Sequence, residues 1–218
     1  MTSKKFIDYA WDNELHKTPG ILKDLVKILS NVRNLQKLSY IDVGCGNGAI
    51  TKILSKFFKN TCGIDLSLDG IRLAKKNNIS KIEFLHKDMD TLIKKKKYFD
   101  FVSAIEVIEH QYDPHLFISQ LNLITKKNGY ILISTPYHGY LKNLLISLLG
   151  MMDNHFTALW RHGHIKFFSL KTLKNLVLTK NIRIGNRSYQ NNLSIINVSF
   201  SGRFFPFSRS MIFLLKKN

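Results

Sequence analysis

The chain has 218 residues, of which 44% are hydrophobic and 22% charged, as is typical of one globular α/β domain. Its formal net charge is +18, and residues 114–218 hold 14 Lys and Arg against one acid, Asp153. With only two cysteines, Cys45 and Cys62, a disulfide framework is excluded and a cytoplasmic location is expected. No apolar run is long enough to cross a membrane.

The sequence predicts a polar, helical N-terminal segment over residues 1–39. Thr18-Pro19 is a helix-start signal, and the apolar residues from Ile21 to Leu29 recur at helical spacing. Tyr9 and Trp11 precede this helix. We expect them to pack against the domain, with a place in the ligand pocket as the alternative.

From Tyr40 onward, apolar strands and amphipathic helices alternate. Helices are predicted at 50–58 and 68–76, and a third begins at Asp113-Pro114 and ends at Asn128-Gly129. This rhythm predicts a doubly wound, mainly parallel sheet. The five strands are predicted at Tyr40–Val43, Thr61–Ile64, Ile82–His86, Phe101–Ile105 and Tyr130–Ser134.

After the fifth strand the rhythm breaks. The spacing predicts helices at Tyr140–Met152 and Ser169–Thr179, and strands near 182–189, 195–200 and 211–215. We therefore interpret the chain as one domain with four parts. These are N-terminal helices (1–39), a cofactor-binding core (40–136), an acceptor-side insert (137–168) and a C-terminal helix with strands (169–218).

The turn after the first strand carries three glycines spaced two apart, Gly44, Gly46 and Gly48, with Cys45 between the first two. Glycines let a ligand approach the backbone closely. Asp42 precedes the turn, and a carboxylate there repels a pyrophosphate. It suits a ligand that is positive at this point, such as a sulfonium with an α-amino group. The turn therefore favours S-adenosylmethionine over NAD.

Acids end the next three strands, at the edge where open α/β sheets bind ligands. Asp65 follows Gly44 by 21 residues, the distance at which an acid accepts both ribose hydroxyls. Asp88 is placed to accept from an adenine amine, while Met89 offers a backbone N–H and an apolar face. Glu106 ends the fourth strand.

These features together resemble a class I S-adenosylmethionine-dependent methyltransferase. Three segments, 101–114, 129–136 and 163–169, are similar to the ubiquinone-biosynthesis O-methyltransferases and their relatives. The resemblance implies a Rossmann-like, seven-stranded sheet with an antiparallel last strand. It also implies O-methylation of a small acceptor such as a quinone or phenol, a sugar or a lipid precursor. The expected cofactor-binding residues are Asp42, Gly44, Cys45, Gly46, Gly48, Asp65, Leu66, Asp88, Met89, Ile105 and Glu106.

Glu106, Glu109 and His110 stand at i, i+3 and i+4, as on one face of a helical turn. In the ubiquinone enzymes the equivalent residues are associated with a divalent metal, which the reaction does not otherwise require. Alternatively, His110 is the catalytic general base, because its pKa suits that role. The third interpretation is that Glu106 lies beside the cofactor, Glu109 caps local backbone and His110 packs.

The insert carries a leucine face over 141–152, for which core packing is the ordinary explanation. The alternatives are a lid and a peripheral contact with an anionic membrane. The basic C-terminal half suggests a nucleic-acid or protein substrate, but no binding motif accompanies it, so a nucleic-acid partner is not expected. His138, His155, His162 and His164 lack a zinc spacing and are expected to line a pocket or the surface.

Overall fold

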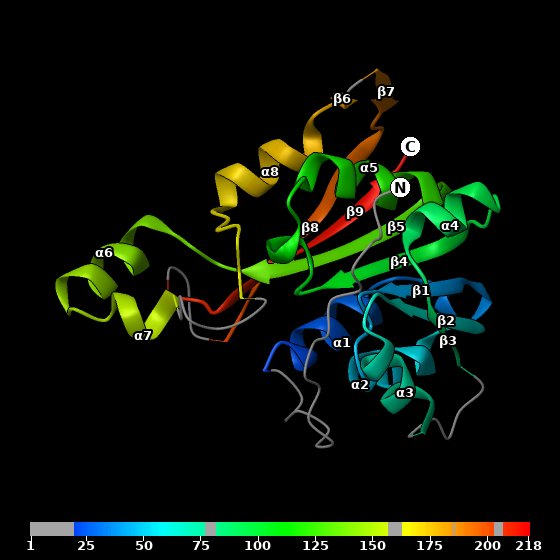
Figure 1. The fold of residues 1–218 in the computed structure, drawn as a ribbon, viewed down its shortest axis with the longest axis horizontal. Helices are drawn as coiled ribbons and strands as arrows, with labels where there is room; N and C mark the ends of the chain where they lie inside the picture. The colour runs from blue at the N-terminus through cyan, green and yellow to red at the C-terminus, as the bar shows by residue number, and fades with distance from the viewer. Residues whose placement is uncertain (1–19, 77–81, 157–162, 185, 203–206) are drawn as a thin grey trace.

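The computed structural model describes residues 20–76, 82–156, 163–184, 186–202 and 207–218 (Figure 1). The predictions made for Tyr9, Trp11, the Thr18-Pro19 helix start and His162 lie outside these residues. No helix in the described ranges is long and apolar enough to span a bilayer.

A seven-stranded sheet has the order β3-β2-β1-β4-β5-β9-β8. Neighbours run parallel from β3 to β5, and β9 runs against both β5 and β8. The predicted Rossmann-like, mainly parallel sheet with an antiparallel last strand is confirmed. The strands are β1 Ser39–Val43, β2 Asn60–Asp65, β3 Glu83–His86, β4 Phe99–Ile105, β5 Thr125–Pro136, β8 Leu193–Ser201 and β9 Ser210–Lys217.

Helices cover both faces of this sheet (Figure 1). Neighbouring residues of one strand enter opposite cores: in β5, Ile131 and Ile133 pack in one cluster and Leu132 in the other. A sheet buried on both faces needs such continuous apolar strands. The helices are α1 Leu22–Ser30, α2 Ala49–Leu54, α3 Leu68–Lys76, α4 Met89–Lys94, α5 Pro114–Ile124, α6 Tyr140–Leu148, α7 Met152–Phe156 and α8 Leu170–Leu178, with 3-10 turns η1 Leu35–Lys37, η2 Ser55–Phe57 and η3 Ile108–His110.

Helix α5 ends four residues before the predicted Asn128-Gly129 stop. The Thr125 hydroxyl donates to the Leu121 carbonyl at 2.7 Å, and β5 begins at this residue. The register of β5 against β4 then shifts, because Phe99 pairs with Thr125 and Phe101 with Tyr130. Asn128 is left-handed at φ 61°, so the Asn-Gly signal marks this irregularity in a strand rather than a helix end.

Two further predictions need correction. The segment 182–189, expected as one strand, is a hairpin of β6 Asn181–Ile184 and β7 Arg187–Gln190, which form a separate two-stranded sheet. The single helix expected over 140–152 is divided between α6 and α7, with Gly150 left-handed at φ 63° between them. The division of the chain into four parts stays a prediction.

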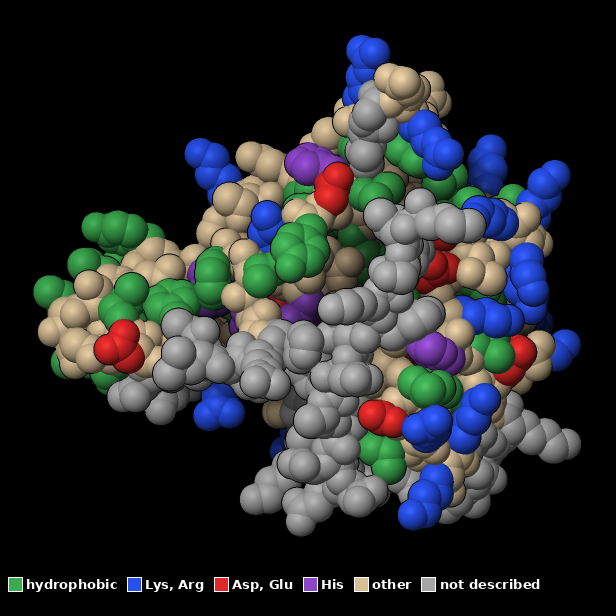
Figure 2. Space-filling model, viewed as in Figure 1, with side chains coloured by type: hydrophobic (Ala, Val, Ile, Leu, Met, Phe, Trp, Pro, Cys, Tyr) green, Lys and Arg blue, Asp and Glu red, His purple; other side chains and the backbone are tan. Residues whose placement is uncertain are grey.

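The insert α6–α7 projects from the body of the molecule (Figure 1), and apolar side chains gather over it (Figure 2). No residue of α6 is buried, and Leu148 is 74% exposed. Core packing was therefore the wrong explanation for the leucine face, because a helical apolar stripe does not reveal what covers it. The large exposed apolar residues of this segment are Tyr140, Leu141, Leu144, Leu145, Leu148, Leu149, Met151 and Met152.

Candidate active site

The glycine turn lies at the carboxyl end of β1. Its glycines are all left-handed, with φ of 75° at Gly44, 52° at Gly46 and 77° at Gly48. The backbone N–H groups of Gly44 and Cys45 donate to the Ile64 carbonyl of β2 at 2.8 and 3.0 Å. A Cβ on Gly44 would lie 2.5 Å from a methyl of Val107, so both backbone conformation and packing require glycine there.

Asp65 ends β2 and fastens the turn. Its Oδ2 accepts from the Gly46 N–H and its Oδ1 from the Ser67 N–H, both at 2.7 Å. A carboxylate has about four acceptor positions, so two such bonds leave room for a pair of ligand hydroxyls. Burial raises the pKa of Asp65, while the backbone donors oppose this shift. Leu66, the next residue, is 43% exposed.

Asp42 lies beneath the turn and is buried. Thr51 of α2 and Ser103 of β4 each donate a hydroxyl to it at 2.5 Å, and Tyr40 shares the Ser103 hydroxyl at 2.7 Å. Burial raises the pKa of Asp42 to about 6, against the effect of these hydroxyl donors. This carboxylate therefore ties α2 to β4, and its predicted contact with a cofactor stays a prediction.

Asp88 and Met89 occupy the end of β3 and the start of α4. The Asp88 side chain is the N-cap of α4, accepting from the Thr91 N–H at 2.9 Å and the Thr91 hydroxyl at 2.6 Å. Met89 is buried in the same core cluster as Ile131 and Ile133 of β5. Asp88 thus has a structural task that sequence reasoning did not foresee, which fixes its carboxylate at the ligand edge of the sheet.

Glu106 follows β4 and the buried Ile105. Its backbone is left-handed at φ 55°, a conformation that is costly for a non-glycine residue and clusters at functional sites. Ser134 donates to Oε1 at 2.7 Å, and Ser210 donates to Oε2 at 3.3 Å. Burial raises the pKa of Glu106 to about 7.

Glu109, His110 and His164 form one cluster, with candidate ligand atoms within 4.8 Å of one another. Thr135 donates to Glu109 Oε2 at 3.0 Å, while Oε1 has no hydrogen bond among the described residues and lies 3.9 Å from His164 Nε2. Burial, and then the nearby Glu106, raise the pKa of Glu109. Glu106 itself lies outside η3, so the expected helical face of Glu106, Glu109 and His110 is not formed; His164 takes the third place.

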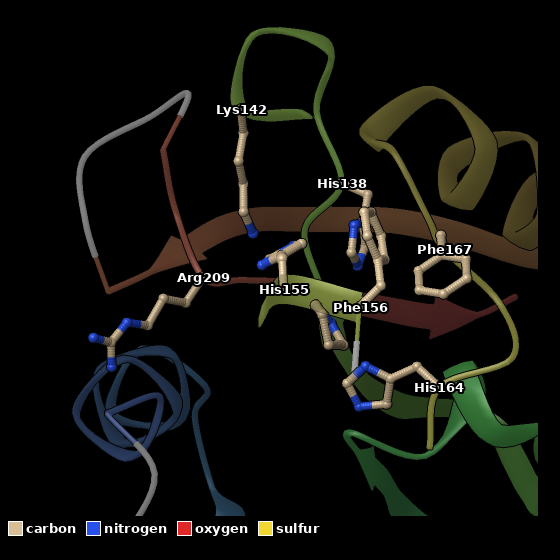
Figure 3. Close-up of a pocket in the computed structure, with 8 residues that line it drawn as sticks. His138, Lys142, His155, Phe156, His164, Phe167 and Arg209 are labelled. Atoms are coloured by element: carbon tan, nitrogen blue, oxygen red, sulfur yellow. The ribbon is translucent and has the colours of Figure 1, made fainter. Parts of the chain in front are cut away.

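A pocket of about 290 Å³ adjoins this cluster through His164 (Figure 3). Sequence reasoning singled out the histidines of this region, but it missed the pocket residues contributed by other parts of the chain. Arg209 lies at this pocket because its backbone carbonyl accepts a hydrogen bond from the Tyr137 N–H at 2.9 Å. No local sequence pattern predicts this contact. The residues lining the pocket are Pro136, His138, Lys142, His155, Phe156, His164, Phe167 and Arg209.

Comparison with known proteins decides the family. The model of a methyltransferase domain matches residues 14–183. This chain belongs to the methyltransferase family. The predicted class, a class I S-adenosylmethionine-dependent methyltransferase, is thereby confirmed, together with its cofactor.

The methyltransferase is similar to several proteins named ubiquinone biosynthesis O-methyltransferase. It is 32% identical over 134 residues to the one from Pelagibacter ubique, covering 60% of this chain and 55% of that relative. It is 33% identical to the one from Rickettsia felis, covering 82% of this chain and 77% of that relative. The chain thus spans about half the length of the first relative and three quarters of the second.

Among solved structures, the methyltransferase is similar to the magnesium protoporphyrin IX methyltransferase from Synechocystis PCC 6803 with bound S-adenosylhomocysteine. The TM-score is 0.65 with 16% sequence identity, and the match covers 91% of this chain and 84% of that one. At this identity the likeness establishes the fold alone. The comparisons lend no support to the nucleic-acid alternative.

Proposed function

We propose that this methyltransferase transfers the methyl group of S-adenosylmethionine to an oxygen of a small acceptor, of the quinone or phenol class. The observation that carries the proposal is the arrangement at one sheet edge. At this edge Asp65 accepts a hydrogen bond from the Gly46 N–H at 2.7 Å, and the Glu109–His110–His164 cluster lies just after the end of β4. The similarity to ubiquinone biosynthesis O-methyltransferases supports a phenolic acceptor.

In this proposal the glycine turn takes the amino-acid end of the cofactor and Asp65 takes the ribose hydroxyls. The backbone of Gly44, Gly46 and Gly48 can approach the ligand closely, because glycine has no side chain and adopts the left-handed conformation found here. Cys45 contributes its backbone, since its side chain is buried in a core cluster. Leu66 offers an exposed apolar face beside the ribose. The remaining proposed contacts are Asp42 toward the amino group, Asp88 and Met89 toward the adenine, and Ile105 and Glu106 along the cofactor edge.

The reaction is an in-line displacement at the methyl carbon, in which the acceptor oxygen forms a bond as the bond to sulfur breaks. Holding the two reactants at near-attack distance supplies much of the rate. We propose that His110 takes the acceptor proton. Its Nδ1 lies 3.3 Å from the Gly163 carbonyl, and the tautomer that donates there keeps Nε2 as the basic nitrogen.

The donor set of the cluster also fits a divalent metal. One carboxylate and two imidazoles are ligands that zinc and other transition metals accept, and Glu109 Oε1 is a buried oxygen without a hydrogen bond in the described structure. Glu109, His110 and His164 would hold the ion, which when bound would lower the pKa of the acceptor hydroxyl. Zinc titration calorimetry tests this: a binding loss in His164→Ala, with the exposed His115→Gln unchanged, is the expected result.

The decisive test of the proposed function is turnover of labelled S-adenosylmethionine. The full chain is incubated with the lipid, polar-metabolite and RNA fractions of a cell extract, and the labelled fraction is identified. We expect label in a phenolic or quinone-type product. Label confined to RNA or protein would overturn the proposal, as would failure to retain S-adenosylmethionine in equilibrium dialysis.

We also propose a peripheral contact between the segment 141–152 and an anionic bilayer. Exposed leucines such as Leu144 and Leu148 would enter the headgroup region, and the basic half of the chain supplies attraction to acidic lipids. Leu144→Ser with Leu148→Ser should reduce sedimentation with phosphatidylglycerol vesicles, whereas Leu178→Ser on α8 serves as the exposed-leucine control. Equal sedimentation of all variants would remove this contact. The cytoplasmic location stays a prediction.

A further inference from the structure

The pocket between β5, α6 and α7 is lined by two cationic side chains, three histidines, two phenylalanines and a proline, and none of its described lining residues is an acid. Lys142 and Arg209 are its cations, and three histidines add imidazole nitrogens. The whole segment 114–218 has a single acid, Asp153. The acid on the side of the reaction centre is Glu109, which lies behind the lining residue His164, 3.9 Å from its Nε2. A concave site with this lining attracts an anionic group.

Lys142 is half-buried without a carboxylate partner among the described residues. Its Nζ donates to two neutral carbonyls, that of Tyr137 at 2.8 Å and that of Ser208 at 3.5 Å. Burial lowers its pKa, and the nearby Arg209 lowers it further. A partly desolvated ammonium without a counter-charge is unfavourable, so an anion placed beside it gains more than it would at the surface.

His138 supplies an independent sign of a missing ligand. It is only 8% exposed, and neither of its ring nitrogens has a hydrogen-bond partner in the described structure. The Oδ1 atom of Asn143 is also buried without a hydrogen-bond partner in the described structure. Asn143 raises the pKa of His138 as a hydrogen-bond acceptor would, and one acceptor can satisfy only one of the two ring nitrogens. Burial, and then Lys142 and His155, lower the pKa of His138 to about 4, so it offers a neutral N–H donor.

Aromatic rings form the other walls. Phe156 stacks on His138 with centroids 5.7 Å apart, and Phe167 meets Phe156 edge-on at 5.1 Å. In Figure 3 the side chains of Lys142, His138 and His155 converge, while the Arg209 guanidinium points away from them. Such walls suit a flat, apolar body whose charged end meets the bases.

The pocket touches the proposed reaction centre at one described residue, His164. His164 lines the pocket, and its ring meets that of His110 edge-on with centroids 5.0 Å apart. The Ile165 N–H donates to the Glu109 carbonyl at 3.0 Å, which keeps this pocket wall against η3. A ligand seated here would therefore have one end near the cluster and the other near Lys142.

We infer that this pocket is an oxyanion subsite for the methyl acceptor: Lys142, His155 and His138 bind a carboxylate or phosphate group of the acceptor, and Phe156 and Phe167 bind its flat body. The inference rests on the proposed function for the identity of the ligand as an acceptor. The same chemistry could be supplied by the phosphate of a lipid headgroup, and the experiment separates the two sources.

The test is calorimetric titration of the full chain with benzoate and with its neutral analogue benzamide. We expect benzamide to bind at least about tenfold more weakly than benzoate, because a charge-assisted hydrogen bond is lost. Lys142→Gln should weaken benzoate by about tenfold and leave benzamide unchanged. Lys174→Gln, an exposed lysine on α8, is the matched control and should change neither.

Should Lys142→Gln melt early by circular dichroism, His155→Phe serves as a second variant that keeps a ring and removes the nitrogens. Equal binding of benzoate and benzamide to the wild type, or benzoate affinity unchanged in both variants, would overturn the subsite. Sedimentation with phosphatidylglycerol vesicles separates the two sources of the oxyanion. If the wild type does not bind benzoate, and Lys142→Gln loses vesicle binding, the oxyanion belongs to a lipid headgroup and the acceptor assignment is overturned. A separate titration with S-adenosylhomocysteine tests the proposed function. Failure to bind this cofactor product would count against the proposed function and not against the oxyanion subsite.

Discussion

Ser134, near the end of β5, and Glu106, just after β4, are joined by two hydrogen bonds in which the Ser134 hydroxyl is once the donor and once the acceptor. The Ser134 hydroxyl donates to Glu106 Oε1 at 2.7 Å, and the Glu106 backbone N–H donates to the same hydroxyl oxygen at 3.0 Å. This reciprocal pair fixes a left-handed residue at the ligand edge of the sheet. The pair also keeps the Glu106 carboxyl group away from solvent, and this burial raises its pKa and makes the stability of the fold depend on pH.

Glu106→Gln should stabilise the protein more as pH rises. The folded pKa of about 7 lies above the ordinary value near 4.5, so between these values the folded state holds a proton that the unfolded state has lost. Its contribution to stability is therefore full below pH 4.5 and is lost as pH rises through 7. The melting temperature of Glu106→Gln minus that of the wild type should grow from pH 5 to pH 8. Glu83→Gln, an exposed position on β3, is the control; a gap independent of pH would contradict the prediction.

Asp65→Ala should abolish cofactor binding measured by calorimetry with S-adenosylhomocysteine. The substitution removes the proposed ribose acceptor and the two 2.7 Å bonds that hold Gly46 and Ser67. A hydrogen bond to a charged group contributes about 1.5–3 kcal/mol, so loss of the two proposed ribose hydrogen bonds should lower affinity by at least about a hundredfold. Asp69→Ala on the exposed face of α3 should leave affinity unchanged. Unchanged affinity in Asp65→Ala would sink the assignment of this acid to the ribose.

The sheet and the proximity of Asp65 to the glycine turn were predictable because their signals are local. Gly44, Gly48 and Asp65 lie within one strand–turn–helix–strand unit, where spacing alone determines proximity. Arg209 and Ser210 could not be predicted, since they join the site through the antiparallel pairing of β9 with β5, in which Pro136 faces Ser210. The same holds for His164, which reaches Glu109 by a contact across 55 residues of sequence. Amphipathic spacing predicted α6 but could not reveal that its leucines are exposed.

Gly48→Ala should destabilise the fold, and a second glycine separates the two reasons. At Gly48 a Cβ would lie 2.7 Å from the Phe84 ring and 3.1 Å from Ala74, in addition to a φ of 77°. Gly150 shares the left-handed backbone, at φ 63°, but has nothing within 4 Å of a Cβ. Chemical denaturation should show a loss of about 1 kcal/mol for Gly150→Ala and about 2–4 kcal/mol for Gly48→Ala. Equal losses would mean that packing at the turn contributes nothing.

The leucines of α6 should be dispensable for folding. Leu144 is 40% exposed and Leu148 74% exposed, so substitution by serine should change the free energy of unfolding by no more than about 0.5 kcal/mol. Leu173→Ala on α8, a fully buried position in the core, should cost about 2–5 kcal/mol in the same urea titration. A large loss for the α6 variants would show that these side chains are covered in the folded protein.

His110→Gln should lower kcat by about a hundredfold or more and change KM little, because a general base acts on the reacting proton rather than on binding. Catechol provides a small phenolic acceptor for the measurement, with label from S-adenosylmethionine as the readout. The wild-type rate should rise with pH as the base loses its proton, and this rise should be absent in the variant. His115→Gln, exposed on α5, provides the matched control and should retain the wild-type profile. A variant that keeps both the rate and its pH dependence would show that His110 only packs against His164, and that the acceptor proton leaves by another route.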